Sequence, residues 1–253
     1  MDVPLYLRRI NYASTLDPTP TTLRALHLAH LRAVPFENLD IHLKRLITLD
    51  LAATFDKIVL RRRGGFCFEL NGLFASLLTD LGFSVTYLSA SDAYDNGQYG
   101  PEFDHLALSV RCANSESESW LADVGWGDTF CEPLRLEIRG EQAQGLRAYR
   151  VAQEGDYRIL WQRDYDGQWK AQYRFTLQPR NLTDFRPMCH YHQTSPESLF
   201  TRNRICSLAT VAGRITLDNW RLITTTAGER QEQLIEDEAT YHRILEETFG
   251  VVL

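Results

Sequence analysis

The sequence has few cysteines, and none of them are paired at a spacing typical of a metal site. The five cysteines lie far apart, at positions 67, 112, 131, 189 and 206, without a Cys-x-x-Cys motif. Because their number is odd and their spacing wide, they predict neither a disulfide framework nor a zinc site. We therefore expect a protein of the reducing cytoplasm that carries no metal.

Long apolar runs and an excess of positive charge are also missing. No apolar window approaches the roughly 20 residues needed to cross a bilayer. The first residues, MDVPLYLRRINY, lack the charged and then apolar pattern of a signal peptide. The formal net charge is −6, and the clusters of Lys and Arg are short. These absences argue against membrane insertion and against nucleic-acid binding.

The first third of the chain has the apolar spacing of helices. With 253 residues, the chain is long enough for one large domain or for two to three small ones. Helices are predicted over residues 21–33, 50–62 and 67–81, with Asp50 as a cap, Gly82 as a C-terminal stop and a turn around Pro35 and Asn38.

From Phe83 onward the apolar residues follow a period of two, which is typical of strands. Segments such as FSVTYLSA, DHLALSV, WLADVGW and YRILWQRD are separated by turn clusters such as DNGQYGP and ANSESES. Their regular spacing favours a barrel or sandwich over βαβ units. A last helix is predicted over residues 236–248, before Gly250. The whole pattern predicts an α+β fold.

Cys67 stands where the backbone geometry changes, in the stretch RRRGGFCFELNGLFASLL. It follows Gly64 and Gly65 and begins a helix, whose N-terminal N–H groups and positive dipole end favour a nucleophilic thiolate. The same N–H groups can bind the oxyanion of a tetrahedral intermediate. From this stretch alone, a small core residue between Phe66 and Phe68 is an equally good interpretation.

A thiolate needs a base, and His105 is the candidate because it opens a strand directly after a loop. Strand parity then selects the carboxylate. Asp104 is adjacent in sequence and points to the opposite face. Asp123 shares the face of His105 in any register that pairs odd with odd residues, and its apolar neighbours predict burial and a hydrogen-bonding partner. The alternative is a strand-end aspartate that forms a turn with Gly125.

Several motifs resemble those of the arylamine N-acetyltransferases. They are RGGFCFELNGLF, DHLALSV, ADVGWG, VPFENLDIHL, FTLQPRNLTDF, YHQTSPESLF and LEETFGVVL, which together extend over nearly the whole chain. The resemblance implies a helical bundle over residues 1–83, an antiparallel β-barrel over 84–185 and a small α/β lid over 186–253. The implied catalytic core is similar to that of cysteine proteases and transglutaminases.

The resemblance also implies a function. An acetyl group would pass from acetyl-CoA, through a Cys67 thioester, to the nitrogen of arylamines or hydrazines, or to the oxygen of N-hydroxyarylamines. Cys67 would be the nucleophile, His105 the base and Asp123 the residue that orients it. The implied acceptor residues are Phe36, Phe103, Asp104, Trp126 and Phe130, and the implied CoA residues are Tyr191, Ser198 and Phe200.

Some positions depart from the family pattern or allow two interpretations. Trp126 stands where relatives usually have a smaller residue or phenylalanine, so it either narrows the acceptor pocket or packs in the core. Glu197 replaces a small polar residue of many relatives. For Arg63 we favour an ion pair with Glu37 over phosphate binding.

Three other functions remain as alternatives at this point: an amide synthase of the same fold that acts on a carrier-bound polyketide, a cysteine hydrolase, and a non-catalytic binding module. The sequence does not identify the physiological amine, the acyl preference, the CoA contacts of the lid or the oligomeric state.

Overall fold

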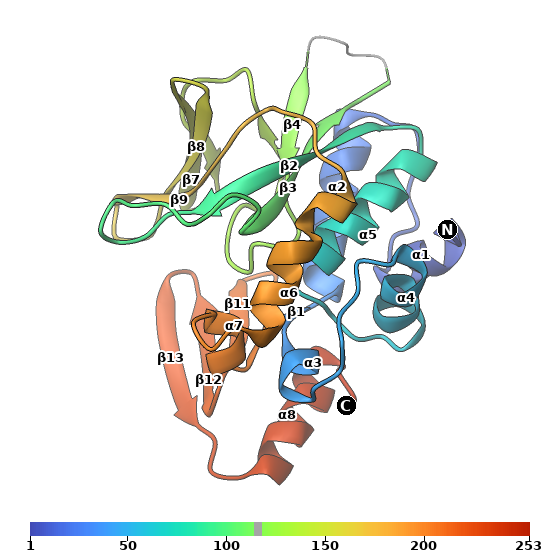
Figure 1. Ribbon diagram of the computed structural model, residues 1–253, viewed down its shortest axis with the longest axis vertical. Coiled ribbons are helices and arrows are strands. Elements are labelled where there is room, and N and C mark those ends of the chain that lie inside the picture. Colours follow the sequence, from blue (N-terminus) through green and yellow to red (C-terminus); the bar gives the residue numbers. More distant parts are fainter. Residues whose placement is uncertain (114–117) are drawn as a thin grey trace.

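The structure is a computed structural model that describes residues 1–113 and 118–253 (Figure 1). Part of the expected turn ANSESES, residues 114–117, lies outside the described residues. Helices occupy one side of the molecule, a large sheet the upper part and a smaller sheet with flanking helices the lower part. Among the described residues, no helix is both long and apolar enough to cross a membrane.

The N-terminal part is helical, as the spacing predicts. Its elements are α1 (Val3–Arg9), α2 (Pro20–Ala33), α3 (Leu39–His42), α4 (Leu51–Phe55), the π-helical turn η1 (Asp56–Leu60) and α5 (Cys67–Asp80). Asp50 caps α4 as expected, since its Oδ1 accepts a hydrogen bond from the N–H of Ala53 at 2.8 Å. The helix predicted over 50–62 is therefore real, but it changes to π geometry after Phe55 and ends at Leu60.

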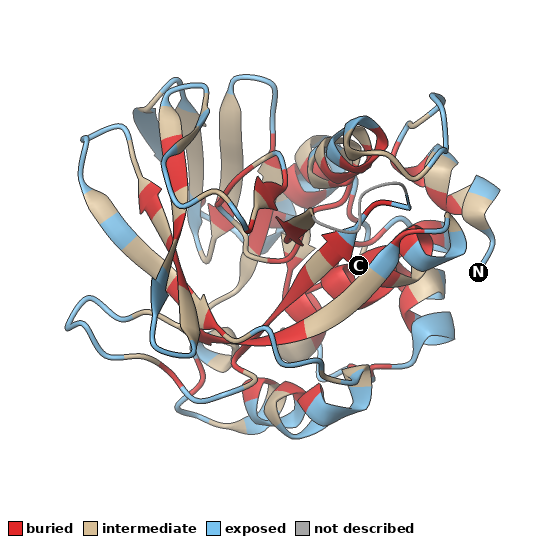
Figure 2. Cartoon of the chain, turned by 90° about the horizontal axis from the view of Figure 1, so that it is seen from above, coloured by how far each residue is buried: buried red, intermediate tan, exposed pale blue. Residues whose placement is uncertain are grey.

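The central helix α5 is buried on almost every side. It packs against α1 and α4 and against the first two strands of the large sheet. Figure 2 shows this helix and the adjoining strands as the buried interior, with exposed residues at the loops and outer helices. Because Cys67 is the first residue of α5, its position is determined by the best-packed helix of the molecule.

The large sheet has eight antiparallel strands and curls into a nearly closed barrel, which confirms the predicted barrel. Its strands are β2 (Ser84–Asp92), β3 (His105–Arg111), β4 (Ser119–Ala122), β5 (Leu134–Arg135), β6 (Gln142–Gln144), β7 (Arg147–Glu154), β8 (Tyr157–Arg163) and β9 (Trp169–Phe175). The spatial order is β5-β4-β3-β2-β9-β8-β7-β6. Between β3 and β4, Ser109 pairs with Leu121 and Leu108 with Ala122, so odd residues face odd ones, as the Asp123 argument required.

The C-terminal part combines short helices with a second antiparallel sheet. It contains η2 (Leu182–Phe185), α6 (Arg186–Thr194), α7 (Leu199–Arg202), β10 (Ile205–Ala209), β11 (Gly213–Asp218), β12 (Arg221–Thr226), β13 (Glu229–Leu234) and α8 (Glu238–Phe249). As expected, Gly250 ends α8, with a left-handed backbone (φ 65°).

One strand of this second sheet comes from the other end of the chain. β1 (Phe36–Glu37) pairs with β10 and forms the edge of the sheet order β1-β10-β11-β12-β13. The alternation of residues gave no signal for so short a strand. In Figure 1 the segment from β1 to α3 lies beside the C-terminal elements. The division at residues 83/84 and 185/186 stays a prediction, and the second sheet crosses it.

A buried cluster of charges supports the loop that precedes Cys67. Arg63 contacts Glu37 at 2.7 Å and Asp40 at 3.1 Å, while Lys57 contacts Asp40 and Glu69 at 2.9 Å each. The expected Arg63–Glu37 pair is thus confirmed. Because these buried charges are paired, the cluster holds the loop in place at the start of α5 without leaving a charge unpaired.

Candidate active site

Cys67 lies at the floor of a cavity of about 530 Å³ between the large sheet and the C-terminal sheet. Its side chain is buried, with 3% of the residue exposed. The loop after β4 passes directly over it: a Cβ atom on Gly125 would lie 2.7 Å from the Cα of Cys67. Only glycine fits at position 125, so this loop and the N-terminus of α5 form one unit.

His105 and Asp123 form a buried pair beside this helix terminus. The Nε2 of His105 lies 2.7 Å from the Oδ2 of Asp123, and neither residue is more than 2% exposed. His105 lines the same cavity as Cys67. The structure therefore brings the three residues selected from the sequence to one place, with Nε2 of His105 held by the carboxylate of Asp123.

The carboxylate of Asp123 accepts three further hydrogen bonds. Asn71 Nδ2 donates at 2.8 Å and the N–H of Gly125 at 2.9 Å, both to Oδ1, while the Tyr173 hydroxyl donates to Oδ2 at 3.0 Å. Burial opposes ionisation, but His105 and these donors lower the pKa of Asp123 below its usual value. Asp123 is therefore a carboxylate that favours a charged His105.

The pKa values of the other two residues depend on burial and on the surrounding carboxylates. Burial alone would lower the pKa of His105, but Asp123, with Asp92 and Asp104, raises it. Burial, followed by the charges of Asp92 and Asp123, raises the pKa of the Cys67 thiol well above its usual value. Burial thus opposes the thiolate that the N-terminus of α5 favours at Cys67.

Four of the predicted substrate and cofactor residues line the cavity. One of them is Trp126, for which the sequence had left open either a place in the cavity wall or a place in the core. These four are Phe36, Asp104, Trp126 and Phe200. Trp126 packs edge-on against His105 at 4.9 Å between ring centroids and donates its indole N–H to Gln172 at 3.3 Å. Trp126 is thus part of the cavity wall, next to His105.

Two predicted acceptor residues lie elsewhere. Phe130 is completely buried and packs against His27 and Tyr149, so it belongs to the core rather than to the cavity wall. Phe103 packs edge-on against Phe185 and beneath the guanidinium of Arg180, also away from the cavity lining. For both residues the position departs from the expected substrate contact, because their rings fill spaces between elements.

The predicted CoA residues Tyr191 and Ser198 also lie outside the lining. Ser198 is buried, caps α7 and contacts Nδ1 of His192 at 3.2 Å. The ring of Tyr191 lies edge-on to that of His192. The Nε2 of His192 lies 3.2 Å from Oδ1 of Asp104, so these residues support the rim of the cavity through His192.

Asn71, Tyr173, His192 and Asp92 are site residues that the sequence analysis missed. For Asn71 a signal was available, since it is a polar residue one helical turn after Cys67, on the same side of the predicted helix. Tyr173 and His192 gave no comparable signal, because their roles depend on which strands and helices meet.

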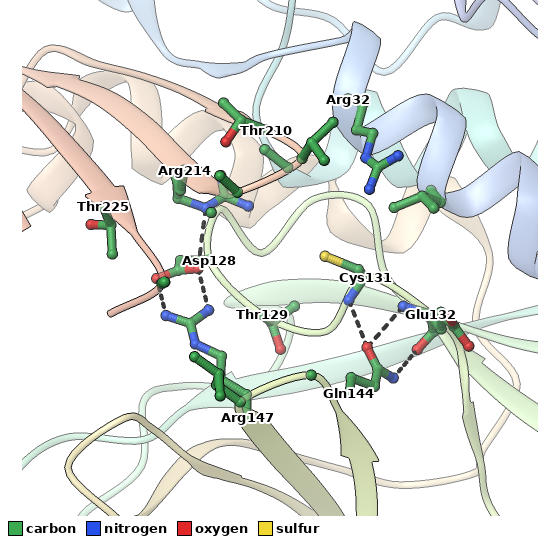
Figure 3. Close-up of a pocket in the computed structure, with 18 of the residues that line it drawn as sticks. Arg32, Asp128, Thr129, Cys131, Glu132, Gln144, Arg147, Thr210, Arg214 and Thr225 are labelled. Atoms are coloured by element: carbon green, nitrogen blue, oxygen red, sulfur yellow. Dashed lines mark hydrogen bonds and ion pairs between the residues drawn. The ribbon is translucent and has the colours of Figure 1, made fainter. Parts of the chain in front are cut away.

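A second cavity of about 420 Å³ lies beside the first (Figure 3). Asp128 stands between Arg147 of β7, at 2.7 Å, and Arg214 of β11, at 3.1 Å, and so joins the two sheets. Asp128, Arg214 and Thr225 line both cavities. As far as the described residues go, no group of three or more His, Cys, Asp or Glu side chains is placed to hold a metal ion.

Comparison with protein families gives a match over almost the whole chain. The family model described as N-acetyltransferase matches residues 19–253. The arylamine N-acetyltransferase of Escherichia coli is 36% identical over 249 residues, which cover 97% of this chain and 87% of the relative. The same identity and coverage hold for the Salmonella typhimurium protein named arylamine N-acetyltransferase / N-hydroxyarylamine O-acetyltransferase.

Solved structures agree with these matches. The Mycobacterium marinum arylamine N-acetyltransferase in complex with CoA superposes with a TM-score of 0.92 at 33% identity, covering 99% of this chain and 93% of that chain. Sequence and structure therefore point to the same group of enzymes.

Proposed function

Because the chain belongs to the arylamine N-acetyltransferase family, we propose that Cys67, His105 and Asp123 carry out the acetyl transfer in two half-reactions. The family uses acetyl-CoA as its donor. The observation that carries the proposal is the placement of Cys67 and His105 on one cavity, with Asp123 hydrogen-bonded to His105 at 2.7 Å.

In the first half-reaction, Cys67 takes the acetyl group. Nδ1 of His105 accepts the thiol proton as Sγ attacks the thioester carbon, because a thiolate in this buried site needs the imidazolium beside it. The bond between the carbonyl carbon and the CoA sulfur then breaks, and the CoA sulfur takes the proton from His105. In this proposal the N–H groups at the start of α5, which begins at Cys67, receive the oxyanion.

In the second half-reaction, an amine takes the acetyl group from Cys67. The nitrogen attacks the thioester carbon, His105 accepts one N–H proton, and Cys67 leaves as a thiolate. Arylamines suit this step, because their nitrogen is largely unprotonated near pH 7. Asp123 holds the imidazole in one orientation and stabilises the imidazolium in both steps.

The C-terminal sheet supplies the basic side of the cavity. Arg214 and Arg230 line it there, with Phe200 at the rim. We propose that this side receives the phosphates and the pantetheine arm of CoA, since guanidinium groups suit phosphate oxygens. Tyr191 and Ser198 remain predicted CoA residues, acting through His192 in this proposal.

Two relatives guide the choice among acceptors and reactions. The Salmonella protein's name includes O-acetylation of N-hydroxyarylamines, which supports extending the proposal to that acceptor oxygen. Both named relatives are acetyltransferases, which favours acetyl transfer over an amide synthase, a cysteine hydrolase or a binding module. The five cysteines, all in the described residues, are free thiols, which supports a cytoplasmic location.

The experiment that tests the proposal is the intact mass of the protein mixed with acetyl-CoA, before and after addition of 4-anisidine. We expect one acetyl group on Cys67, lost when the amine is added, and no acetyl group on a Cys67→Ala variant. An unmodified mass, with Cys67 still open to alkylation, would contradict the proposed donor. Loss of the acetyl group without the amine would indicate a hydrolase.

A further inference from the structure

Asp92 is an acidic side chain of the cavity that the mechanism above does not use. It is the last residue of β2 and lines the cavity together with Cys67 and His105. Its Oδ1 is shielded from solvent and has no hydrogen-bond partner in the described structure. Because a shielded carboxylate oxygen without a donor is costly, this position calls for an explanation.

The strand register places Asp92 close to the proposed base. In the pairing of β2 with β3, Ala90 lies directly opposite His105, so Asp92 shares the face of His105 and is its diagonal neighbour. Diagonal neighbours have Cβ atoms about 7–8 Å apart. Asp92 lies directly opposite Tyr173 of β9, whose hydroxyl is already bound to Asp123.

The ionisable groups around Asp92 leave it without a partner in the described part of the chain. Burial and the charges of Asp104 and Asp123 raise the pKa of Asp92 to about 7, although His105 and His192 act in the opposite direction. Within the described residues neither ring donates to Asp92: Nε2 of His105 contacts Asp123, and the ring of His192 contacts Asp104 and Ser198. The charges of the two histidines therefore lower the pKa of Asp92, but neither ring donates a hydrogen bond to it.

The arginines of the cavity are engaged as well. Arg214 contacts Asp128 at 3.1 Å, and Arg230 contacts Glu232 at 2.7 Å. A molecule that fills the cavity is therefore the available source of a donor for Asp92.

We propose that Asp92 determines acceptor specificity by accepting a hydrogen bond from an N–H group on the atom next to the reacting nitrogen. This inference rests on the proposed function. The reacting nitrogen must lie between the Cys67 thioester and His105, and Asp92 lines the same cavity on the face of His105. We therefore place the next atom of the acceptor beside Asp92. The favoured class is hydrazides and hydrazines with an internal N–H, whereas a carboxylate at that point is repelled by Asp92 and Asp104.

Two hydrazides that differ at one atom provide the test. Benzhydrazide has an internal N–H, and its analogue methylated on that nitrogen keeps the nucleophilic NH₂ but loses the donor. For the wild type we expect kcat/KM to favour benzhydrazide on the order of 10- to 100-fold, as for a hydrogen bond to a charged acceptor. This ratio of kcat/KM values should become smaller in Asp92→Asn. In Asp92→Val it should fall below about threefold, which is the effect of the added methyl group without any lost hydrogen bond.

The matched control is Asp95→Asn, since Asp95 is an exposed aspartate in the turn after β2. It should keep the wild-type preference. An unchanged preference in Asp92→Val would overturn the inference, and so would equal kcat/KM values for the two hydrazides in the wild type, whether or not the variants fold. Intact mass after acetyl-CoA separates the two proposals: an unacetylated wild type defeats the proposed function, whereas an acetylated wild type without the preference defeats only the role of Asp92.

Discussion

The carboxylate of Asp123 accepts four hydrogen bonds, so its orientation is determined before any substrate enters. That arrangement matters because, in the proposed mechanism, its partner His105 must keep one orientation while it accepts a proton in each half-reaction. Asp92 is the opposite case, a nearby carboxylate with an oxygen that no donor of the described residues reaches. The two carboxylates thus differ in the number of hydrogen-bond donors around them, and a prediction follows for each residue.

Replacing Asp123 by Asn should remove most of the activity and leave the fold intact. The change preserves shape, but the side-chain amide cannot stabilise an imidazolium, so we expect kcat to fall on the order of 10³- to 10⁴-fold. Steady-state rates with 4-anisidine and a thermal melt measure the two effects. Tyr173→Phe, which removes only one of the four donors, should cost roughly tenfold. Persistent activity in Asp123→Asn would mean that another residue orients His105.

The raised pKa of Asp92 predicts a stability effect that depends on pH. Its pKa is about 7 in the folded protein and about 3.9 in an unfolded chain, so the folded state holds an extra proton between these values. The contribution of Asp92 to the free energy of unfolding is therefore fully present below about pH 4. It is lost as the pH rises from there through 7.

Asp92→Asn should therefore gain in stability relative to the wild type as the pH rises from 5 to 8. Because the residue is partly exposed, we expect a discounted gain of about 2 kcal/mol, or roughly 5 °C in Tm. Paired melts at each pH measure the difference, in which the groups common to both proteins cancel. The exposed control Asp95→Asn should show no such trend, and a flat difference for Asp92→Asn would contradict the raised pKa.

At the scale of elements, the site depends on a close contact between the N-terminus of α5 and the loop after β4. Asn71 links the two, because its Oδ1 accepts the N–H of Val124 at 2.9 Å while its Nδ2 donates to Asp123. Gly125 allows the approach, since any Cβ there would meet backbone atoms of Cys67. Cys67 and Asp123 are thus held together by backbone packing as well as by side chains.

Gly125→Ala should disrupt this contact. A Cβ at 2.7 Å from the Cα and 2.9 Å from the carbonyl oxygen of Cys67 forces the backbone to move, and we expect acetylation of Cys67 to slow about 100-fold or more. The rate of mass gain with acetyl-CoA measures this loss. Gly140→Ala is the matched control, since a Cβ at that position would have no heavy atom of the described residues within 4 Å, apart from its chain neighbours. Normal acetylation of Gly125→Ala would show that the loop can shift at little cost.

At the scale of the whole molecule, the cavity exists because three parts of the chain meet. The large sheet and α5 form its floor, and the C-terminal sheet forms its opposite wall. Asn38, completely buried, joins the N-terminal part to that wall: Nδ2 donates to the carbonyls of Phe200 and Asn203, and Oδ1 accepts the N–H of Ile205. The position of the C-terminal sheet relative to the N-terminal helices therefore depends on Asn38, which lies far from that sheet in the sequence.

Asn38→Ala should loosen the C-terminal wall and weaken CoA binding. Three partly buried backbone groups lose their partner, so we expect the free energy of unfolding to fall by about 2 to 4 kcal/mol. KM for acetyl-CoA should rise more than kcat falls, because the chemistry lies on the other wall. Urea unfolding and steady-state kinetics measure both effects, with the exposed Asn96→Ala as control. A lower kcat with an unchanged KM for acetyl-CoA would contradict this prediction and place the defect in the reacting groups.

The sequence by itself determined much of the local structure and was enough to select Cys67, His105 and Asp123 as candidate reacting residues. Helix α5 and strand β3 follow from the apolar period, and the parity of β3 and β4 was enough to select Asp123 over Asp104. The confirmed Arg63–Glu37 pair also required only opposite charges near a helix end. These features are local or involve neighbouring strands, so spacing along the chain determines them.

Only the tertiary structure decided which faces meet across the cavity. It placed β1 beside β10, made Trp126 a cavity wall and Phe130 a core residue, and left an oxygen of Asp92 without a donor among the described residues. It also raised the pKa of Cys67, because burial depends on the packing of all parts around it. Long-range contacts and desolvation are properties of the assembled fold, and no spacing along the chain determines them.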